Sequence, residues 1–242
     1  MFLDKDRSAP MSHPPFSPLR GIVALLALVA TAAPLVGQNV TLDEGRFALF
    51  RGGREVGTET FTIHRVGMGN DARLLASGTI SYDGVEMRPA LETRPDFVLT
   101  RYQNEMTGSR SAELSVVLDG NRYVSRMSAP EGDLQREYRA APRTSVLENY
   151  IAHHYYFLAR FADEASTPLV VLVPAEGEQA RLEVVSSEPE PFQLGGEQLQ
   201  SRHLRLQGGG VIRDLWVDDQ GRVLRVELPG LDFRAERLPS GS

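Results

Sequence analysis

The stretch that decides the fold is Thr144-Ser-Val-Leu-Glu-Asn-Tyr-Ile-Ala-His-His-Tyr-Tyr-Phe-Leu-Ala-Arg-Phe-Ala-Asp163. It is the only long helical pattern after the N-terminal leader, and it holds two of the five histidines of the chain. Large side chains recur in it at spacings of four and three residues, which places them on one face of a helix. They are Leu147, Ile151, His154, Leu158 and Phe161, and Tyr150 and Phe157 widen the stripe. An apolar stripe of this width must be covered, and a sheet is the expected cover.

Both ends of this stretch carry helix-boundary signals. Ser145 as N-cap places Glu148 at the third helical position, which completes a capping box. Pro168 prevents continuation because it has no backbone N–H to donate. The pattern therefore predicts one helix over about residues 144–163, which is roughly five turns at about 3.6 residues per turn.

The composition narrows the class of protein. The 242 residues carry a formal charge of −6, with 24% charged residues, as in a folded domain. The basic residues are scattered among acidic ones, which argues against a nucleic-acid partner. The chain contains no cysteine, which excludes disulfides, thiol catalysis and lipidation at an N-terminal cysteine. We expect no cofactor.

The N-terminus has the pattern of an export signal. Arg20 precedes a short apolar run over 21–33, and Ala30-Thr-Ala32 satisfies the small-x-small rule for cleavage. We expect residues 1–37 to be a signal peptide and leader, which makes the protein periplasmic or secreted. An uncleaved membrane anchor is the alternative, and Met11 is an alternative start to Met1.

After the leader, the hydrophobic pattern changes to period two, which is typical of half-buried strands. Turn signals separate about a dozen such runs at intervals of roughly 8–12 residues. The clearest are Gly52-Gly53, Asp83-Gly84, Asp119-Gly-Asn121 and Asp219-Gln-Gly221. Such spacing indicates an antiparallel meander.

Together these patterns predict a mainly β protein. We expect a large curved antiparallel meander, an open or half barrel, packed around one long α-helix and preceded by a signal-peptide helix. Residues 38–242 form a single β-rich domain in this interpretation. The alternative is two sheet lobes divided at the helix.

Several segments resemble a secreted, β-rich bacterial family with the open β-barrel of periplasmic lipoprotein carriers. They are the leader, the opening Phe47-Ala-Leu-Phe-Arg-Gly-Gly-Arg-Glu-Val-Gly-Thr-Glu59, the motif His153-His154-Tyr155, and the closing Leu215-Trp-Val-Asp-Asp-Gln-Gly-Arg-Val-Leu-Arg-Val-Glu227. The resemblance covers most of the mature chain. It implies a binding or carrier role and supplies no catalytic residue.

No motif for catalysis or metal binding stands out. No Gly-x-Ser-x-Gly elbow occurs, and adjacent helical histidines point about 100° apart, so His153 and His154 do not suit one metal ion. We expect a core position for His154, and for His153 a place at a polar mouth. The candidates for ligand binding, in a groove between sheet and helix, are Asn149, Tyr150, His153, His154, Phe157, Leu158 and Trp216.

Three functions remain open from the sequence. The favoured one is a non-enzymatic cell-envelope protein that binds a hydrophobic ligand (a lipid or a lipoprotein acyl chain) or an envelope protein in that groove, with peripheral membrane contact possible. The alternative is a secreted hydrolase that uses His153 or His154 with a carboxylate. The third is an assembly protein whose exposed strand edge pairs with another chain.

Overall fold

The computed structural model describes residues 39–162 and 169–239, all of which belong to one compact unit. Fifteen strands of this part form one open sheet, and its one α-helix is α1 (Tyr155–Ala162). The expected fold class is confirmed, because the described chain is mainly β and its meander packs around a helix. The predicted signal-peptide helix lies outside the described residues.

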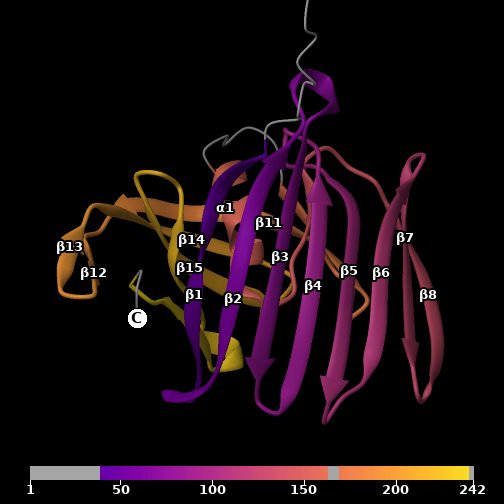
Figure 1. Cartoon of the computed structure of the whole chain (residues 1–242), viewed down its shortest axis with the longest axis horizontal. Helices are drawn as coiled ribbons and strands as arrows, with labels where there is room; N and C mark the ends of the chain where they lie inside the picture. Colours follow the sequence, from indigo (N-terminus) through magenta and orange to yellow (C-terminus); the bar gives the residue numbers. More distant parts are fainter. Residues whose placement is uncertain (1–38, 163–168, 240–242) are drawn as a thin grey trace, which may run out of the picture. The chain divides into compact units, whose positions relative to one another are not determined.

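The first half of the sheet is a meander of eight strands, each antiparallel to the next. Figure 1 shows most of them side by side, in indigo to rose. They are β1 (Val40–Arg51), β2 (Arg54–Val66), β3 (Arg73–Tyr82), β4 (Val85–Thr93), β5 (Leu99–Gly108), β6 (Ala112–Asp119), β7 (Arg122–Ala129) and β8 (Gly132–Arg139).

The second half continues the same sheet, because the last strand pairs antiparallel with the first. From β1 the order runs through β17 (Phe233–Arg237), β16 (Val223–Leu228), β15 (Val211–Asp218), β14 (Ser201–Gly208), β11 (Glu178–Pro189), β10 (Leu169–Val173) and β9 (Thr144–Val146). A separate hairpin consists of β12 (Phe192–Leu194) and β13 (Glu197–Leu199), and short 3-10 turns lie at η1 (Gly69–Asp71), η2 (Ala152–His154) and η3 (Pro229–Leu231).

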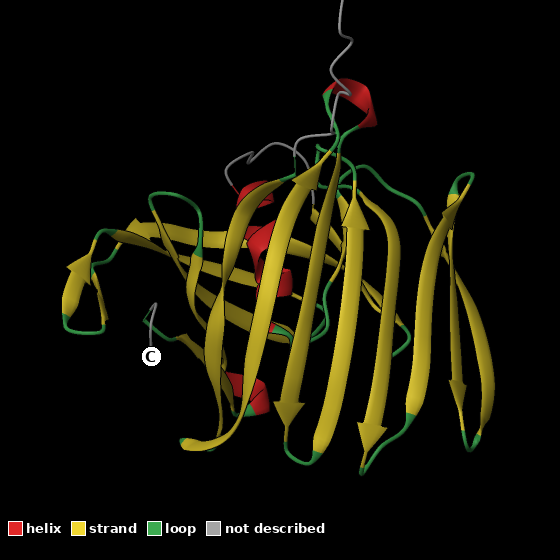
Figure 2. Ribbon diagram, in the orientation of Figure 1, coloured by secondary structure: helices red, strands yellow, loops and turns green. Residues whose placement is uncertain are grey.

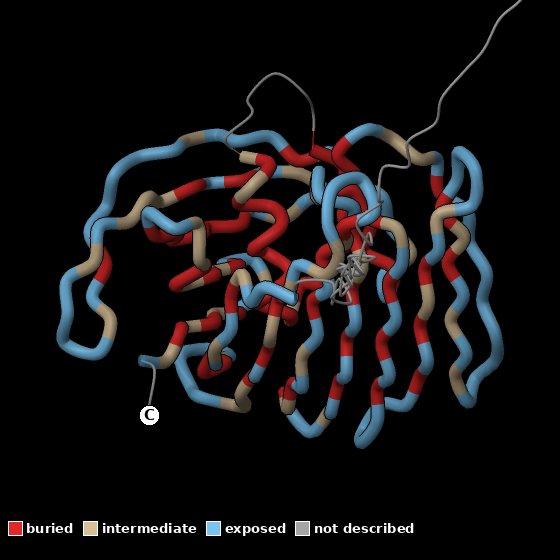
Figure 3. The backbone as a smooth tube through the Cα atoms, turned by 45° about the horizontal axis from the view of Figure 1, so that its top comes forward, coloured by how far each residue is buried: buried red, intermediate tan, exposed pale blue. Residues whose placement is uncertain are grey.

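The sheet curls around α1. The helix contacts β10, β15 and β16, while the two histidines just before it meet rings of β2 and β5 on the other side. In Figure 2 the red helix lies behind the first strands, with later strands crossing near it. Buried and exposed residues alternate along the strands in Figure 3, as the period-two pattern predicts.

The predicted hairpin turns are confirmed. Asp83 and Gly84 join β3 to β4 with φ values of 50° and 79°, and a two-residue hairpin turn of type I′ requires positive φ at both positions. Gly52 and Gly53 join β1 to β2 with φ values of 54° and 78°. These turns set the register of the first sheet half.

The predicted start of the helix at residue 144 is wrong. Residues 144–146 form β9, which pairs in parallel with β10. This is the one parallel pair among the described strands. The chain then continues without regular structure to Ile151, and the helical turns begin at Ala152. The capping box is absent as well, because the Glu148 carboxylate accepts from the backbone N–H of Ala175 instead. The predicted end at Asp163 lies outside the described residues.

The cause of this error is burial on every side. Nearly all residues from Thr144 to Ala159 are buried, so the stretch has no solvent-exposed face against which a helical period could be read. Thr144 and Val146 are β-branched and suit a strand, and β10 offers them a free edge. Tertiary pairing therefore overrides the local pattern.

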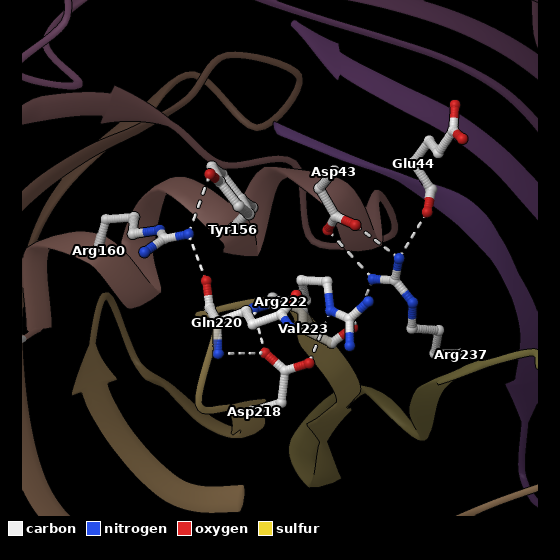
Figure 4. A network of polar contacts seen from close by, with 9 residues as sticks. All are labelled: Asp43, Glu44, Tyr156, Arg160, Asp218, Gln220, Arg222, Val223 and Arg237. Carbon is white, nitrogen blue, oxygen red and sulfur yellow. Dashed lines mark hydrogen bonds and ion pairs between the residues drawn. The ribbon is translucent and has the colours of Figure 1, made fainter. Parts of the chain in front are cut away.

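Arginine networks hold α1 against the second half of the sheet (Figure 4). Arg160 of α1 donates to the carbonyl of Gln220 at 2.7 Å, and Asp218 stabilises that turn by accepting from the N–H of Gln220 at 3.0 Å. Arg237 of β17 is buried and makes a bidentate ion pair with Asp43 of the adjacent strand β1, at 2.6 and 3.1 Å. The Arg160 contact holds the later part of α1 against the turn between β15 and β16, and the Arg237–Asp43 pair joins β17 to β1.

Candidate functional site

A carboxylate of β2 holds the start of the helical segment. Glu59 is fully buried, and its two oxygens accept from the backbone N–H groups of Ala152 at 2.7 Å and His153 at 2.8 Å. These are N–H groups that the first turn of a helix leaves without partners. The His153 ring nitrogen Nδ1 lies 2.8 Å from the same carboxylate. Glu59 therefore acts as an N-cap from a distant strand, and its own burial is compensated by three hydrogen bonds.

The sheet is shaped to accept the His153 ring. The ring stacks on Phe61 with centroids 5.7 Å apart and planes 5° apart. A Cβ atom on Gly78 of β3 would lie 3.0 Å from His153 Cε1, so a larger residue there would require the ring or the strand to shift. His153 is 1% exposed, and the expectation that it lines a polar mouth is wrong.

His154 is a core residue, as predicted. Its Nδ1 accepts from the backbone N–H of Glu148 at 3.2 Å, and its ring meets the edge of Tyr102 at 5.3 Å. Burial, and after it the neighbouring His153, lowers the pKa of His154 well below the usual value, so the ring is neutral. Neither histidine is accessible to a substrate.

A cleft of about 380 Å³ lies beside residues 148–151, where this segment meets β3, β4 and β5. One part of its wall is apolar and consists of Tyr82, Val85, Met87, Met106, Tyr150 and Ile151. The other part is polar and consists mainly of Arg51, Asp83, Asn104, Ser109, Arg110, Glu148, Asn149 and Glu176. A concave site of this size with both kinds of lining suits a small amphipathic molecule.

Glu148 is the buried acid of this cleft. Its Oε1 accepts from the N–H of Ala175 at 3.3 Å. Burial raises the pKa of Glu148 to about 8, and the nearby Glu176 adds to the increase, whereas the hydrogen bond from Ala175 opposes it. The carboxyl therefore carries its proton at neutral pH and can donate a hydrogen bond.

Asn149 is held between two charged groups. Its Nδ2 donates to Glu176 at 2.6 Å, and its Oδ1 accepts from the buried Arg213 of β15 at 3.3 Å. Arg213 also donates to the carbonyls of Gly208 and Val211. The polar side of the cleft is thus rigidly attached to the second half of the sheet.

Tyr150 supplies the aromatic wall. Its ring stacks on Tyr82 with centroids 5.1 Å apart and meets the edge of Phe233 at 5.4 Å. At the rim, Arg51 forms an ion pair with Asp83. The aromatic pair is already assembled, so a ligand that packs on it need not order these side chains.

The structure separates the predicted site residues into three groups. Asn149 and Tyr150 line the cleft, with His153 and His154 enclosed behind it. Phe157 and Leu158 are fully buried core residues and do not line this cleft. The predicted groove between sheet and helix is therefore filled by side chains.

Trp216 lies apart from the cleft. It packs with Phe192 and Leu224 in a small cluster separate from the main core, and its ring stacks on His203 at 4.3 Å. Its indole N–H donates to Glu190 at 3.0 Å. Trp216 was expected in the groove, but alternation along a strand cannot say which face of the sheet looks inward.

Most of the cleft lining could not be found from the sequence, including Asn104 and the acid role of Glu148, and neither could the cap that Glu59 forms on the helical segment. One signal was present in the sequence. Glu59 lies two residues before Phe61 on the same inward face of β2, and Asn104 lies two residues after Tyr102 on the same inward face of β5. A polar residue on an otherwise apolar strand face is a sign of a buried partner.

Comparisons with protein-family models, with curated proteins and with solved structures find no match. In the part of the chain that the structure describes, no group of three or more His, Asp or Glu side chains is placed to hold a metal ion. Within residues 39–162 and 169–239, no helix has the length and apolar character that a membrane crossing requires. The function is therefore argued from the cleft itself.

Proposed function

We propose that this chain is an exported, non-enzymatic binding protein of the cell envelope, and that it holds a small molecule with a hydrophobic body in the cleft at Glu148–Ile151. The observation that carries the proposal is the preformed wall of Tyr82, Tyr150, Met87 and Met106 facing the buried acid. Thioether and aromatic groups adapt to apolar ligands, and the few polar groups opposite them fix orientation.

The site differs from the groove expected from the sequence. Because Phe157 and Leu158 are fully buried, an acyl chain has no space between sheet and helix in the described structure. The cleft beside that segment has about 380 Å³, and slightly more than half of its lining is polar. We therefore propose a compact amphipathic ligand in place of a fully enclosed chain.

Two alternatives have less support. A hydrolase that uses His153 or His154 requires a substrate to reach rings that are at most 1% exposed. Assembly through a sheet edge would use β8, whose exposed residues include Asp133, Arg136 and Glu137. Charged side chains on an edge strand oppose pairing with another chain.

Export is supported by the leader pattern of residues 1–37, which lie outside the described residues. The chain has no cysteine for lipid attachment, so we propose a periplasmic or secreted protein.

Native mass spectrometry of protein purified from the periplasm without detergent tests this proposal. We expect an adduct of small mass that solvent extraction releases. Met106→Trp, which fills the apolar wall, should abolish the adduct in a variant whose circular dichroism is unchanged. Met68→Trp is the matched control, because Met68 is 53% exposed and does not line the cleft. An adduct that survives in folded Met106→Trp protein would place the ligand elsewhere.

A further inference from the structure

The floor of the cleft contains two polar groups whose bonding is incomplete. Oε1 of Glu148 accepts from Ala175, while its Oε2 has no hydrogen-bond partner among the described residues. Asn104 of β5 lines the same cleft and is 3% exposed, and its Oδ1 is buried without a partner. Buried polar groups in native proteins are usually satisfied, so the unpaired Oδ1 of Asn104, in the same cleft as Glu148, indicates that a ligand's polar group binds at this end.

The charges that line the cleft are balanced in number. Arg51 is paired with Asp83 at the rim, and the lining contains one further cation, Arg110, and one further anion, Glu176, which accepts from Asn149. A cleft that contains as many cations as anions, besides a protonated Glu148, favours a ligand without net charge.

Among the described residues, no cation forms an ion pair or a hydrogen bond with Glu148, although Arg51 and Arg110 line the same cleft. The other titratable groups around it are Tyr102 from β5, Tyr138 from β8, Glu176 from the turn after β10, and the neutral His154, whose Nδ1 is occupied by the Glu148 N–H. Within the described part of the chain, the hydrogen bond to its carboxylate comes from the N–H of Ala175. The carboxyl is therefore built to work as a donor.

We infer that the ligand is an uncharged molecule that presents a carbonyl, amide or ester oxygen to the protonated Glu148 carboxyl, with its apolar body on the Tyr82–Tyr150 wall. This inference rests on the proposed function of the cleft. The carboxyl O–H donates to the carbonyl oxygen, and an ionised Glu148 would have no proton to donate and would repel that oxygen. Binding is consequently linked to the proton on Glu148.

Three probes with one octyl chain and different head groups test the ligand class: octanamide, octanoate and octylammonium. Isothermal titration calorimetry with the mature protein at pH 7 should rank octanamide first. Because the pKa of Glu148 is about 8, its protonated fraction, and with it the affinity for octanamide, falls about tenfold between pH 7 and pH 9. Circular dichroism at both pH values checks that the protein remains folded.

Glu148→Gln keeps a donor and removes the titration, so its affinity for octanamide should be the same at pH 7 and pH 9. Glu105→Gln is the matched control on the outer face of β5, where Glu105 pairs with Arg88, and it should retain the tenfold change. If Glu148→Gln does not fold, the pH dependence of the octanamide affinity of the wild-type protein tests the inference by itself.

The outcomes separate the inference from the proposed function. An octanamide affinity that does not change with pH, or tighter binding of octanoate or octylammonium, overturns the inference and leaves a binding cleft. Octylammonium that binds better at pH 9 than at pH 7 would mean that the ionised Glu148 recognises a cation. Absence of binding for all three probes counts against the cleft as a ligand site and so against both.

Discussion

Two clusters in this protein bring histidine and carboxylate together, one inside the curled sheet and one on its outside. The inner cluster consists of Glu59, Glu148, His153 and His154, all within the core. The outer cluster consists of Glu190, His203, Asp214, Trp216 and Arg225, near the β12–β13 hairpin. In both, a histidine nitrogen lies 2.8 Å from a carboxylate oxygen.

The difference between them is access to water. The His153 and Glu59 side chains are 0% exposed, whereas His203 is 21% exposed and its second partner Glu190 is 50% exposed. In the core, a lost partner leaves a polar group that water cannot reach. At the surface, solvent replaces much of a lost contact. Loss of a histidine–carboxylate contact should therefore reduce the free energy of unfolding strongly in the inner cluster and weakly in the outer cluster.

The largest effect is expected for Glu59→Ala. The substitution leaves the N–H groups of Ala152 and His153, and the His153 ring, without their acceptor. We expect a loss of about 3–5 kcal/mol in the free energy of unfolding, measured by urea denaturation. Glu105→Ala, on the exposed face of β5, should change it by less than about 0.5 kcal/mol. A loss below about 1 kcal/mol for Glu59→Ala would contradict the proposed cap.

The next effect concerns pH. The pKa of Glu148 is raised from 4.5 to about 8, so between these values the folded state holds a proton that the unfolded state has lost. The free energy of unfolding should therefore fall as pH rises through this window, by up to about 1.4 kcal/mol per pH unit.

Glu148→Gln removes this dependence, and the difference between its stability curve and that of the wild type isolates Glu148 from other groups. His154 has the opposite effect on the pH dependence. Because its pKa is lowered in the folded state, the free energy of unfolding falls as the pH drops below 6.5, the usual pKa of histidine. Parallel curves for the two proteins between pH 5 and pH 8 would show that Glu148 ionises normally.

A smaller effect is expected for Gly78→Ala. The added methyl group would lie 3.0 Å from His153 Cε1 and 3.2 Å from the carbonyl of Thr60, so ring or strand must shift. We expect a loss of about 1–3 kcal/mol, which is typical of overpacking. Gly230→Ala is the control, because a Cβ atom there has no neighbour within 4 Å. Equal stabilities of the two variants would mean that the His153 ring adjusts freely.

The smallest effect is expected in the outer cluster. His203→Gln should reduce the free energy of unfolding by less than about 1 kcal/mol, because Glu190 is half exposed to solvent and the buried Asp214 keeps its ion pair with Arg205. The chain has one tryptophan, Trp216, so its emission spectrum reports the lost stacking directly. A loss as large as that of Glu59→Ala would remove the distinction between the two clusters.

Much of the sheet was predictable because its determinants are local. Alternation along β1 to β8 and the positive-φ turns at Gly52-Gly53 and Asp83-Gly84 specify hairpins between neighbouring segments. Asn149 and Tyr150 were also found, since the segment that contains them is unusual in composition. The rest of the cleft comes from strands that are distant in sequence, such as β1 with Arg51 and β3 with Tyr82.

By itself, the sequence determined a mainly β chain without disulfides and a central segment that had to be buried. The alternation of side chains and the turn residues act over a few positions, so no tertiary contact is needed to read them. Only the tertiary structure decided that residues 144–146 are a strand, that Trp216 faces away from the cleft, and that Glu59 caps the helix. The physical reason is that a segment enclosed on all sides takes its conformation and its protonation from distant partners. The free edge of β10 selects a strand, the carboxylate of β2 starts a helix, and the loss of water keeps the proton on Glu148.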